Sequence, residues 1–164
     1  MICNSHDVKI KILAVSICGS DVHILADPPG TAANPGIILG HECVGEIVDM
    51  GEGIDGAFCE YAVVPEYSAA KIPKGTDIRK AIFAEPLACV MNAEKLAAPT
   101  PADYVLLYGA GPISLTFIRV LKMFGVRNLI VAAKGQECVT EAKNCGRGNV
   151  KCVIDTWQTD NVMR

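Results

Sequence analysis

The amino-acid sequence predicts an α/β protein, in which a small β domain precedes a parallel sheet with its helices. Alternating apolar and polar residues at 8–15 are typical of a half-buried strand, and strand patterns recur at 44–48 and 58–64 between Pro- and Gly-rich turns. After 99–101, strands alternate with helices, which indicates βαβ units. The apolar content of 51%, with only 5% aromatic residues, suits strands buried on both faces and argues against disorder.

The second half of the chain carries the clearer sequence of elements. The stretch 78–98 is rich in Ala, Leu, Glu and Lys and predicts helices interrupted by Pro86. The Pro-Thr-Pro linker at 99–101 then divides the chain into expected domains 1–98 and 99–164. The remaining expected elements are a strand at 104–108, a helix at 112–124, a strand at 128–132, a helix at about 137–144 and a strand at 151–154.

Charge and hydropathy exclude several kinds of partner. The net charge of −3 and the pI near 5.6 provide no basic surface for nucleic acid or acidic lipid, so a small-molecule partner is expected. No stretch approaches the roughly 18 apolar residues of a membrane helix, and the N-terminus lacks the layout of a signal peptide. We therefore expect a cytoplasmic protein whose eight cysteines stay reduced.

A glycine turn follows the expected strand at 104–108. Gly109 and Gly111 allow the chain to turn tightly and bring its backbone against a pyrophosphate, which would sit at the N-terminus of the next helix. Pro112 fits the first helical turn, Ile113 follows it, and Ser114 stands where the third glycine of a dinucleotide fingerprint is expected. The alternative is an ordinary turn between a strand and a helix.

The residue after the second strand bears on the choice of cofactor. The acidic residue that holds the adenosine ribose is expected about 20 residues beyond the glycine turn. That strand ends at Lys134 with no carboxylate. Lys134 can pair with a 2′-phosphate, which favours NADP over NAD, or it is simply a solvated lysine. The cofactor is therefore expected to be NAD or NADP.

Cys18, His41 and Glu42 are candidate metal ligands. Thiolate, imidazole and carboxylate are the ligand types that zinc accepts, and a catalytic site takes three of them. A separation of 23 residues between Cys18 and His41 does not by itself indicate a site, because unrelated core residues often show such a spacing. No two cysteines have the close spacing of a zinc ribbon.

Five motifs, taken together and in order, resemble the zinc-dependent medium-chain dehydrogenase/reductase family, especially its threonine and sorbitol (polyol) dehydrogenase branch. The resemblance covers essentially the whole chain. The motifs are Cys18-Gly19-Ser20-Asp21, Gly40-His41-Glu42, Asp55-Gly56-Ala57-Phe58-Cys59-Glu60-Tyr61, Glu85-Pro86-Leu87-Ala88 and Gly109-Ala110-Gly111-Pro112-Ile113.

The resemblance implies a GroES-like β-barrel domain joined to a Rossmann domain, with one catalytic zinc. Cys18 and His41 would ligate this zinc, and Glu42 would either ligate it or exchange with water. Glu85 matches the remaining ligand position. Cys89, one helical turn beyond it, is either a substitute ligand or a buried thiol.

The resemblance also implies a reaction. Zinc would polarise the hydroxyl of an alcohol, polyol or hydroxy-amino acid, and hydride would pass to NAD(P). Ser20 matches the hydroxyl that passes the proton, and His23 matches the residue that relays it to solvent, unless it is only a surface histidine.

Two departures from the family are expected. The chain passes from 54 to 55 without the several dozen residues that include the structural-zinc lobe, so no structural zinc site is expected. Only the first half of the doubly wound sheet is expected, which would leave an unpaired apolar edge at the third strand, 151–154, and impair turnover. The alternatives are a non-catalytic remnant that binds zinc or nucleotide without turnover, and an interaction module that pairs through the open edge with another copy or a full-length relative.

Overall fold

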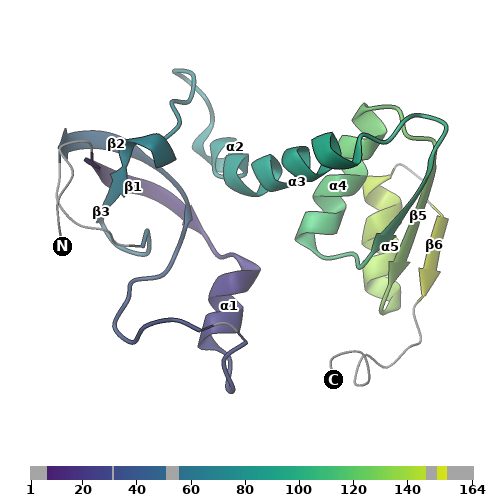
Figure 1. Ribbon diagram of the computed structural model, residues 1–164, viewed down its shortest axis with the longest axis horizontal. Helices are drawn as coiled ribbons and strands as arrows, with labels where there is room; N and C mark the ends of the chain where they lie inside the picture. Colours follow the sequence, from purple (N-terminus) through teal and green to yellow (C-terminus); the bar gives the residue numbers. More distant parts are fainter. Residues whose placement is uncertain (1–6, 31, 51–55, 147–150, 155–164) are drawn as a thin grey trace. The chain divides into compact units, whose positions relative to one another are not determined.

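The computed structural model describes residues 7–30, 32–50, 56–146 and 151–154 (Figure 1). The chain separates into two compact units, Met1–Glu85 and Pro86–Arg164. The sequence predicts the domain boundary after residue 98 instead. The two positions lie near opposite ends of one helix, and the sequence-based boundary stays a prediction.

The first unit contains a three-stranded antiparallel sheet. Its strands are β1 (Asp7–Ser16), β2 (Glu42–Met50) and β3 (Tyr61–Pro65), in the order β2-β1-β3. All three expected strands are present with shifted ends. The helix α1 (Gly19–Leu25) follows β1 and was not expected from the sequence.

Side-chain alternation along β1 agrees with its central place in this sheet. Val8 is buried and lies opposite Val64 of β3, whose neighbours Ala62 and Val63 are also buried. On the other side, β1 lies so close to β2 that a side chain at Gly45 would collide with Ile10 and with the backbone of β1. The sheet lies in the part of the chain where the GroES-like domain is expected.

Short helices lead from the first unit to the second. They are η1 (Glu66–Ser68), α2 (Ile78–Ala81) and α3 (Ala84–Ala97). The sequence-based expectation that Pro86 interrupts the helix is wrong, because Pro86 lies in the first turn of α3. A proline is tolerated there, since the N–H that it lacks has no helical partner in a first turn.

The second unit is a parallel sheet with helices. Its strands β4 (Tyr104–Tyr108), β5 (Asn128–Ala133) and β6 (Lys151–Ile154) lie in the order β4-β5-β6, and α4 (Pro112–Met123) and α5 (Gln136–Cys145) connect them. This confirms the expected βαβ units, and the bounds of β4 and β6 agree with the expectation.

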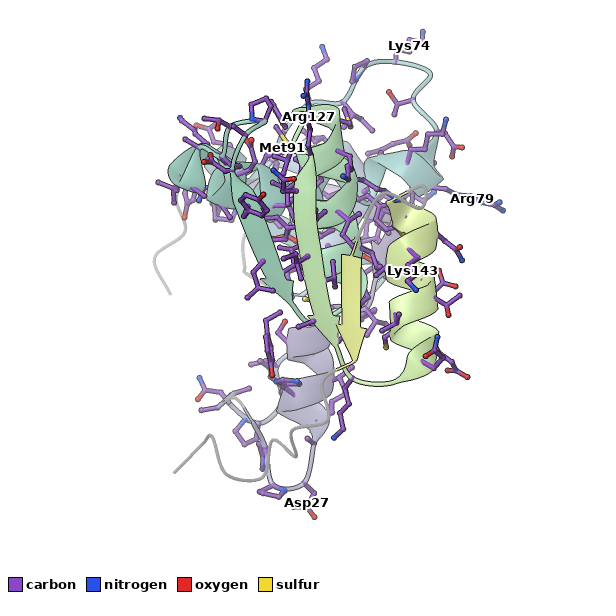
Figure 2. All side chains as sticks on the ribbon, turned by 90° about the vertical axis from the view of Figure 1, so that its right-hand side faces the viewer. Asp27, Lys74, Arg79, Met91, Arg127 and Lys143 are labelled. Carbon is purple, nitrogen blue, oxygen red and sulfur yellow. The ribbon has the colours of Figure 1, made fainter. Side chains whose placement is uncertain are left out.

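Both connecting helices cover the same face of this sheet (Figure 1). The buried core draws on α4, β5 and α5, where Ile118, Leu129 and Val131 are no more than 2% exposed. Burying each such side chain contributes roughly 1.5–3 kcal/mol. The opposite face is turned toward the viewer in Figure 2. No helix in the described ranges is both long and apolar enough to cross a membrane.

Candidate metal centre and nucleotide loop

Cys18, His41 and Glu42 come together in the first unit. One ligand atom from each lies within 4.8 Å of the other two. Ligand atoms around a tetrahedral zinc are roughly 3.3–3.8 Å apart, given Zn–N and Zn–S distances of about 2.0–2.3 Å. Small side-chain adjustments are therefore enough to close the group around one ion. The donor set of thiol, imidazole and carboxylate also fits zinc.

The antiparallel pairing of β1 and β2 brings these residues together. The C-terminal end of β1 meets the N-terminal end of β2, where Ser16 is paired with Glu42. Cys18 lies two residues after the end of β1, and His41 lies immediately before the start of β2. A separation of 23 residues in the sequence thus becomes proximity in space.

Gly40 fixes the approach of the chain to His41. Its φ of +96° lies in the left-handed region that favours glycine, and a Cβ here would stand 2.8 Å from the ring carbon Cδ2 of Phe58. The Ala57 N–H donates to the Gly40 carbonyl at 2.9 Å, and the Phe58 N–H donates to the Leu39 carbonyl at 3.0 Å. These contacts hold the segment that leads into the metal group.

Asp21 connects two of the candidate ligands and was not singled out from the sequence. It is only 4% exposed. One carboxylate oxygen accepts from the Cys18 N–H at 2.9 Å, and the other lies 3.8 Å from His41 Nδ1. With Nδ1 facing this carboxylate, Nε2 is the nitrogen left for a metal. Cys18 is the N-cap of α1, and Asp21 is the third residue of that helix. The three-residue spacing between Cys18 and Asp21 is therefore the feature of the sequence that could have indicated this contact.

Ser16 is a second contact that the sequence did not reveal. Its hydroxyl donates a hydrogen bond to Oε2 of Glu42. Glu42 is 7% exposed, so its carboxylate requires such a partner.

The proposed proton-transfer residues lie on α1. Ser20 and His23 are both exposed, and neither belongs to the three-residue metal group. The His23 carbonyl accepts from the Gly30 N–H at 2.9 Å, which folds the following loop back toward the helix. The relay through these two residues stays a prediction.

Glu85 and Cys89 lie on α3, where both are exposed. Neither belongs to the group formed by Cys18, His41 and Glu42. The assignment of Glu85 as a further ligand stays a prediction.

Cys43, next to the metal group, behaves as a structural thiol. Burial raises the pKa of its thiol, and the nearby Cys59 raises that pKa further. The Sγ atom of Cys59 lies 3.0 Å from the carbonyl oxygens of both Gly56 and Tyr61, and its single S–H donates to one of them at a time. Among the described cysteines, Cys18 is the one that belongs to the metal group. The cysteines described as free thiols are Cys18, Cys43, Cys59, Cys89, Cys138 and Cys145.

The expected nucleotide loop lies between β4 and α4 in the second unit. Gly109 has a φ of +99° and donates its N–H to the Ala132 carbonyl of β5 at 2.7 Å, so the turn is anchored to the sheet. Gly111 caps α4 and Pro112 is its first residue, while Ile113 is 46% exposed. A Cβ built on Gly111 meets no atom within 4 Å. The helix N-terminus is thus accessible to an anion.

Lys134 follows β5, at the carboxyl edge of the same sheet as the glycine turn. Its side chain is exposed. Its pairing with a 2′-phosphate stays a prediction.

Comparisons with known proteins agree with this arrangement. The alcohol dehydrogenase GroES-like domain family matches residues 4–56. The L-threonine 3-dehydrogenase of Pyrococcus furiosus is 32% identical over 199 residues, covering 95% of this chain and 56% of that protein. The sorbitol dehydrogenase of Halalkalibacterium halodurans is 29% identical over 198 residues, covering 94% and 56%.

A solved structure extends the likeness through both units. It is the alcohol dehydrogenase RspB from Escherichia coli CFT073, complexed with the cofactor NADH. It matches with a TM-score of 0.82 and 30% identity, over 96% of this chain and 58% of that one. Over both units the chain is therefore similar to dehydrogenases of the medium-chain dehydrogenase/reductase family, and residues 4–56 match its GroES-like domain.

The chain spans about half the length of the curated relatives that it matches. The alignment with the threonine dehydrogenase runs over 199 residues, more than the 164 of this chain, so that relative holds residues with no counterpart here. The GroES-like match ends at residue 56, beside the expected junction at 54–55. The junction itself lies outside the described residues, and the loss of a structural-zinc lobe stays a prediction.

Proposed function

We propose that the chain binds one catalytic zinc and acts as an oxidoreductase, moving hydride between an alcohol, polyol or hydroxy-amino acid and NAD(P). The observation that carries this proposal is the convergence of Cys18, His41 and Glu42 within 4.8 Å. Relatives named as sorbitol and threonine dehydrogenases support the substrate class, and a solved relative with NADH supports the cofactor class.

Each residue of the metal centre has a defined part in this proposal. Zinc, when bound, supplies the Lewis acidity that makes a substrate hydroxyl easier to deprotonate. Cys18, His41 and Glu42 hold the ion, with Glu85 as a proposed further ligand, while Asp21 orients the imidazole through Nδ1.

The proton and the cofactor are assigned to other parts of the chain. Ser20 accepts the substrate proton and His23 passes it to solvent. The first turn of α4, from Gly111 onward, binds the cofactor pyrophosphate through free backbone N–H groups. Lys134 pairs with the 2′-phosphate where the cofactor is NADP.

A second candidate function is the binding of zinc or nucleotide without turnover. In a doubly wound sheet, a dinucleotide occupies the crevice where the strand order reverses between the two halves. The described part of the second unit has three parallel strands in the unreversed order β4-β5-β6. This observation favours a half-site, formed by the described strands, that holds the adenosine side of the cofactor.

Metal analysis of the purified chain, together with turnover assays, separates these candidates. We expect about one zinc per wild-type chain and a loss of zinc in Cys18→Ser. Cys138→Ser, a half-buried thiol of the second unit, is the matched control and should keep its zinc. Reduction of NAD or NADP with sorbitol or threonine then tests turnover. Zinc without turnover supports the second candidate, whereas wild-type protein without zinc contradicts the first.

A further inference from the structure

The last pair of the β1–β2 ladder connects the sheet to the metal centre. Ser16 and Glu42 lie directly opposite each other there. Directly opposed residues in an antiparallel pair project their side chains to the same face of the sheet. The ladder therefore presents the Ser16 hydroxyl to the Glu42 carboxylate.

Two register shifts in the ladder determine this pairing. The first, between Lys9 and Ile10, skips one residue of β2. The second makes Leu13 an extra residue in β1, because Ile12 is paired with Gly45 but Ala14 with Val44, and it restores the register of the first pairs. Without the second shift, Ser16 would have been paired with His41 instead. Irregularities of this kind commonly re-aim side chains near functional sites. Here the second shift gives the serine a carboxylate partner.

The hydrogen bond restrains a carboxylate that has little access to water. Ser16 donates to Oε2 of Glu42, and Glu42 is 7% exposed. A carboxylate has two oxygens with several acceptor positions, so Oε1 keeps its lone pairs for a cation while Oε2 accepts from the serine. Without the hydroxyl, rotation of the carboxylate would be less restricted, and Oε2 would lose a buried partner.

We propose that Ser16 is a positioning residue of the metal centre, which aims the Glu42 carboxylate at the ion held by Cys18 and His41. The inference rests on the proposed zinc-binding function and adds a residue outside the ligand set. Partners of metal ligands typically change metal affinity by about 10- to 100-fold when they are removed.

The test compares two substitutions of similar shape. Ser16→Val removes the hydroxyl and Ser16→Thr keeps it, and both β-branched residues suit a strand end. Zinc affinity is measured by competition with a chromophoric chelator, with Co²⁺ absorption as a report on ligand geometry. We expect Ser16→Val to bind zinc about 10- to 100-fold more weakly and to show an altered cobalt spectrum, while Ser16→Thr retains both properties. Ser68→Ala, in the same unit, is the control for a serine remote from the ladder.

A double-mutant cycle separates positioning from a general structural effect. If Ser16 acts through Glu42, then Ser16→Val has no further effect on zinc affinity in a Glu42→Ala background. Equal zinc affinity and equal spectra for Ser16→Val and Ser16→Thr would overturn the inference but leave the zinc site standing. A wild-type chain that binds no zinc would instead overturn the proposed function. Should Ser16→Val not fold, Ser16→Ala takes its place in the cycle.

Discussion

Two polar residues that are not ligands, Asp21 and Ser16, hold the candidate metal ligands in place. Asp21 reaches from the first turn of α1 to the Cys18 N–H and to within 3.8 Å of His41. Because it is almost completely buried, its carboxylate acts as a fixed internal acceptor rather than a solvated charge. Ser16 fulfils a comparable role for Glu42. The ligands are thus supported from both sides by residues that do not ligate.

Asp103 gives a prediction of pH dependence at the residue scale. The Thr100 N–H donates to this carboxylate at 2.6 Å and the Thr100 hydroxyl donates at 2.8 Å; first the backbone bond and then the side-chain bond lower its pKa. A pKa lowered by folding stabilises the turn above the unfolded pKa of about 3.9, and this contribution is lost as the pH falls through the folded value. NMR titration of the Asp103 carboxyl should give a pKa below about 3.9.

Thr100→Val provides the control for this titration. The substitution removes the hydroxyl donor but keeps the backbone donor, so the pKa of Asp103 should rise only part of the way toward its ordinary value. A pKa of Asp103 at or above the ordinary value in the wild-type chain would contradict the prediction.

The metal ligands could be predicted from the sequence only because five family motifs occur in it in the expected order. Cys18 and His41 are 23 residues apart, and nothing local in the sequence indicates that two strands will bring them together. Asp21 and Ser16 were missed for a related reason. Their contacts depend on the cap of α1 and on the register shift at Leu13, which are three-dimensional features that hydrophobic periodicity does not encode.

At the scale of elements, the two glycines of the turn between β4 and α4 are needed for different reasons. Gly109 has a positive φ and is required for the shape of the turn, whereas Gly111 has a φ of −74° that alanine can adopt. A Cβ at Gly111 meets no protein atom within 4 Å, so the space before it is available for a phosphate.

We therefore predict that Gly111→Ala weakens nucleotide binding without weakening the fold. Calorimetric titration with NADH and NADPH should show at least about a tenfold loss of affinity, equivalent to about 1.4 kcal/mol. The urea midpoint should stay unchanged, because the new methyl group collides with nothing in the protein. Gly19→Ala, another position with open space at its Cβ, is the control that should affect neither property. Unchanged nucleotide affinity in Gly111→Ala would indicate an ordinary turn.

Elements were predictable where their pattern is strong and local. The bounds of β4 and β6 agree with the expectation because short apolar runs flanked by turn residues mark their ends. The helix α1 was missed because its seven residues are too few for an apolar period to stand out. Pro86 was misinterpreted as a helix breaker because its effect depends on its position within the helix, which the sequence leaves open.

At the scale of the whole molecule, the described sheet of the second unit has two edges, at β4 and at β6. In a doubly wound fold, the first strand of the first half lies beside the fourth strand, at the point where the order reverses. Among the described strands, β4 pairs only with β5, so the edge that would accept that fourth strand is unpaired. The edge predicted from the sequence is that of the third strand, and β6 also pairs only with β5 in the described ranges. The edge at β4 is the one that the second half would cover.

The face of β4 that the helices do not cover is apolar. Tyr104, Leu106 and Tyr108 alternate along the strand and are 81%, 63% and 68% exposed. Val105 and Leu107, which alternate with them, pack against the core. An apolar edge strand with unpaired backbone groups favours association between chains.

The last prediction concerns the solubility of the chain at this edge. Leu106→Lys places a charge on the uncovered face, so self-association measured by analytical ultracentrifugation should decrease. Because Leu106 is largely exposed, the free energy of unfolding should change by no more than about 0.5 kcal/mol. Leu107→Lys is the matched control, because the side chain of Leu107 is partly buried against the core and a charge there should destabilise the unit by roughly 1–3 kcal/mol. If Leu106→Lys associates as the wild type does, then the β4 face does not drive association, and self-association must arise from another surface such as the edge of β6.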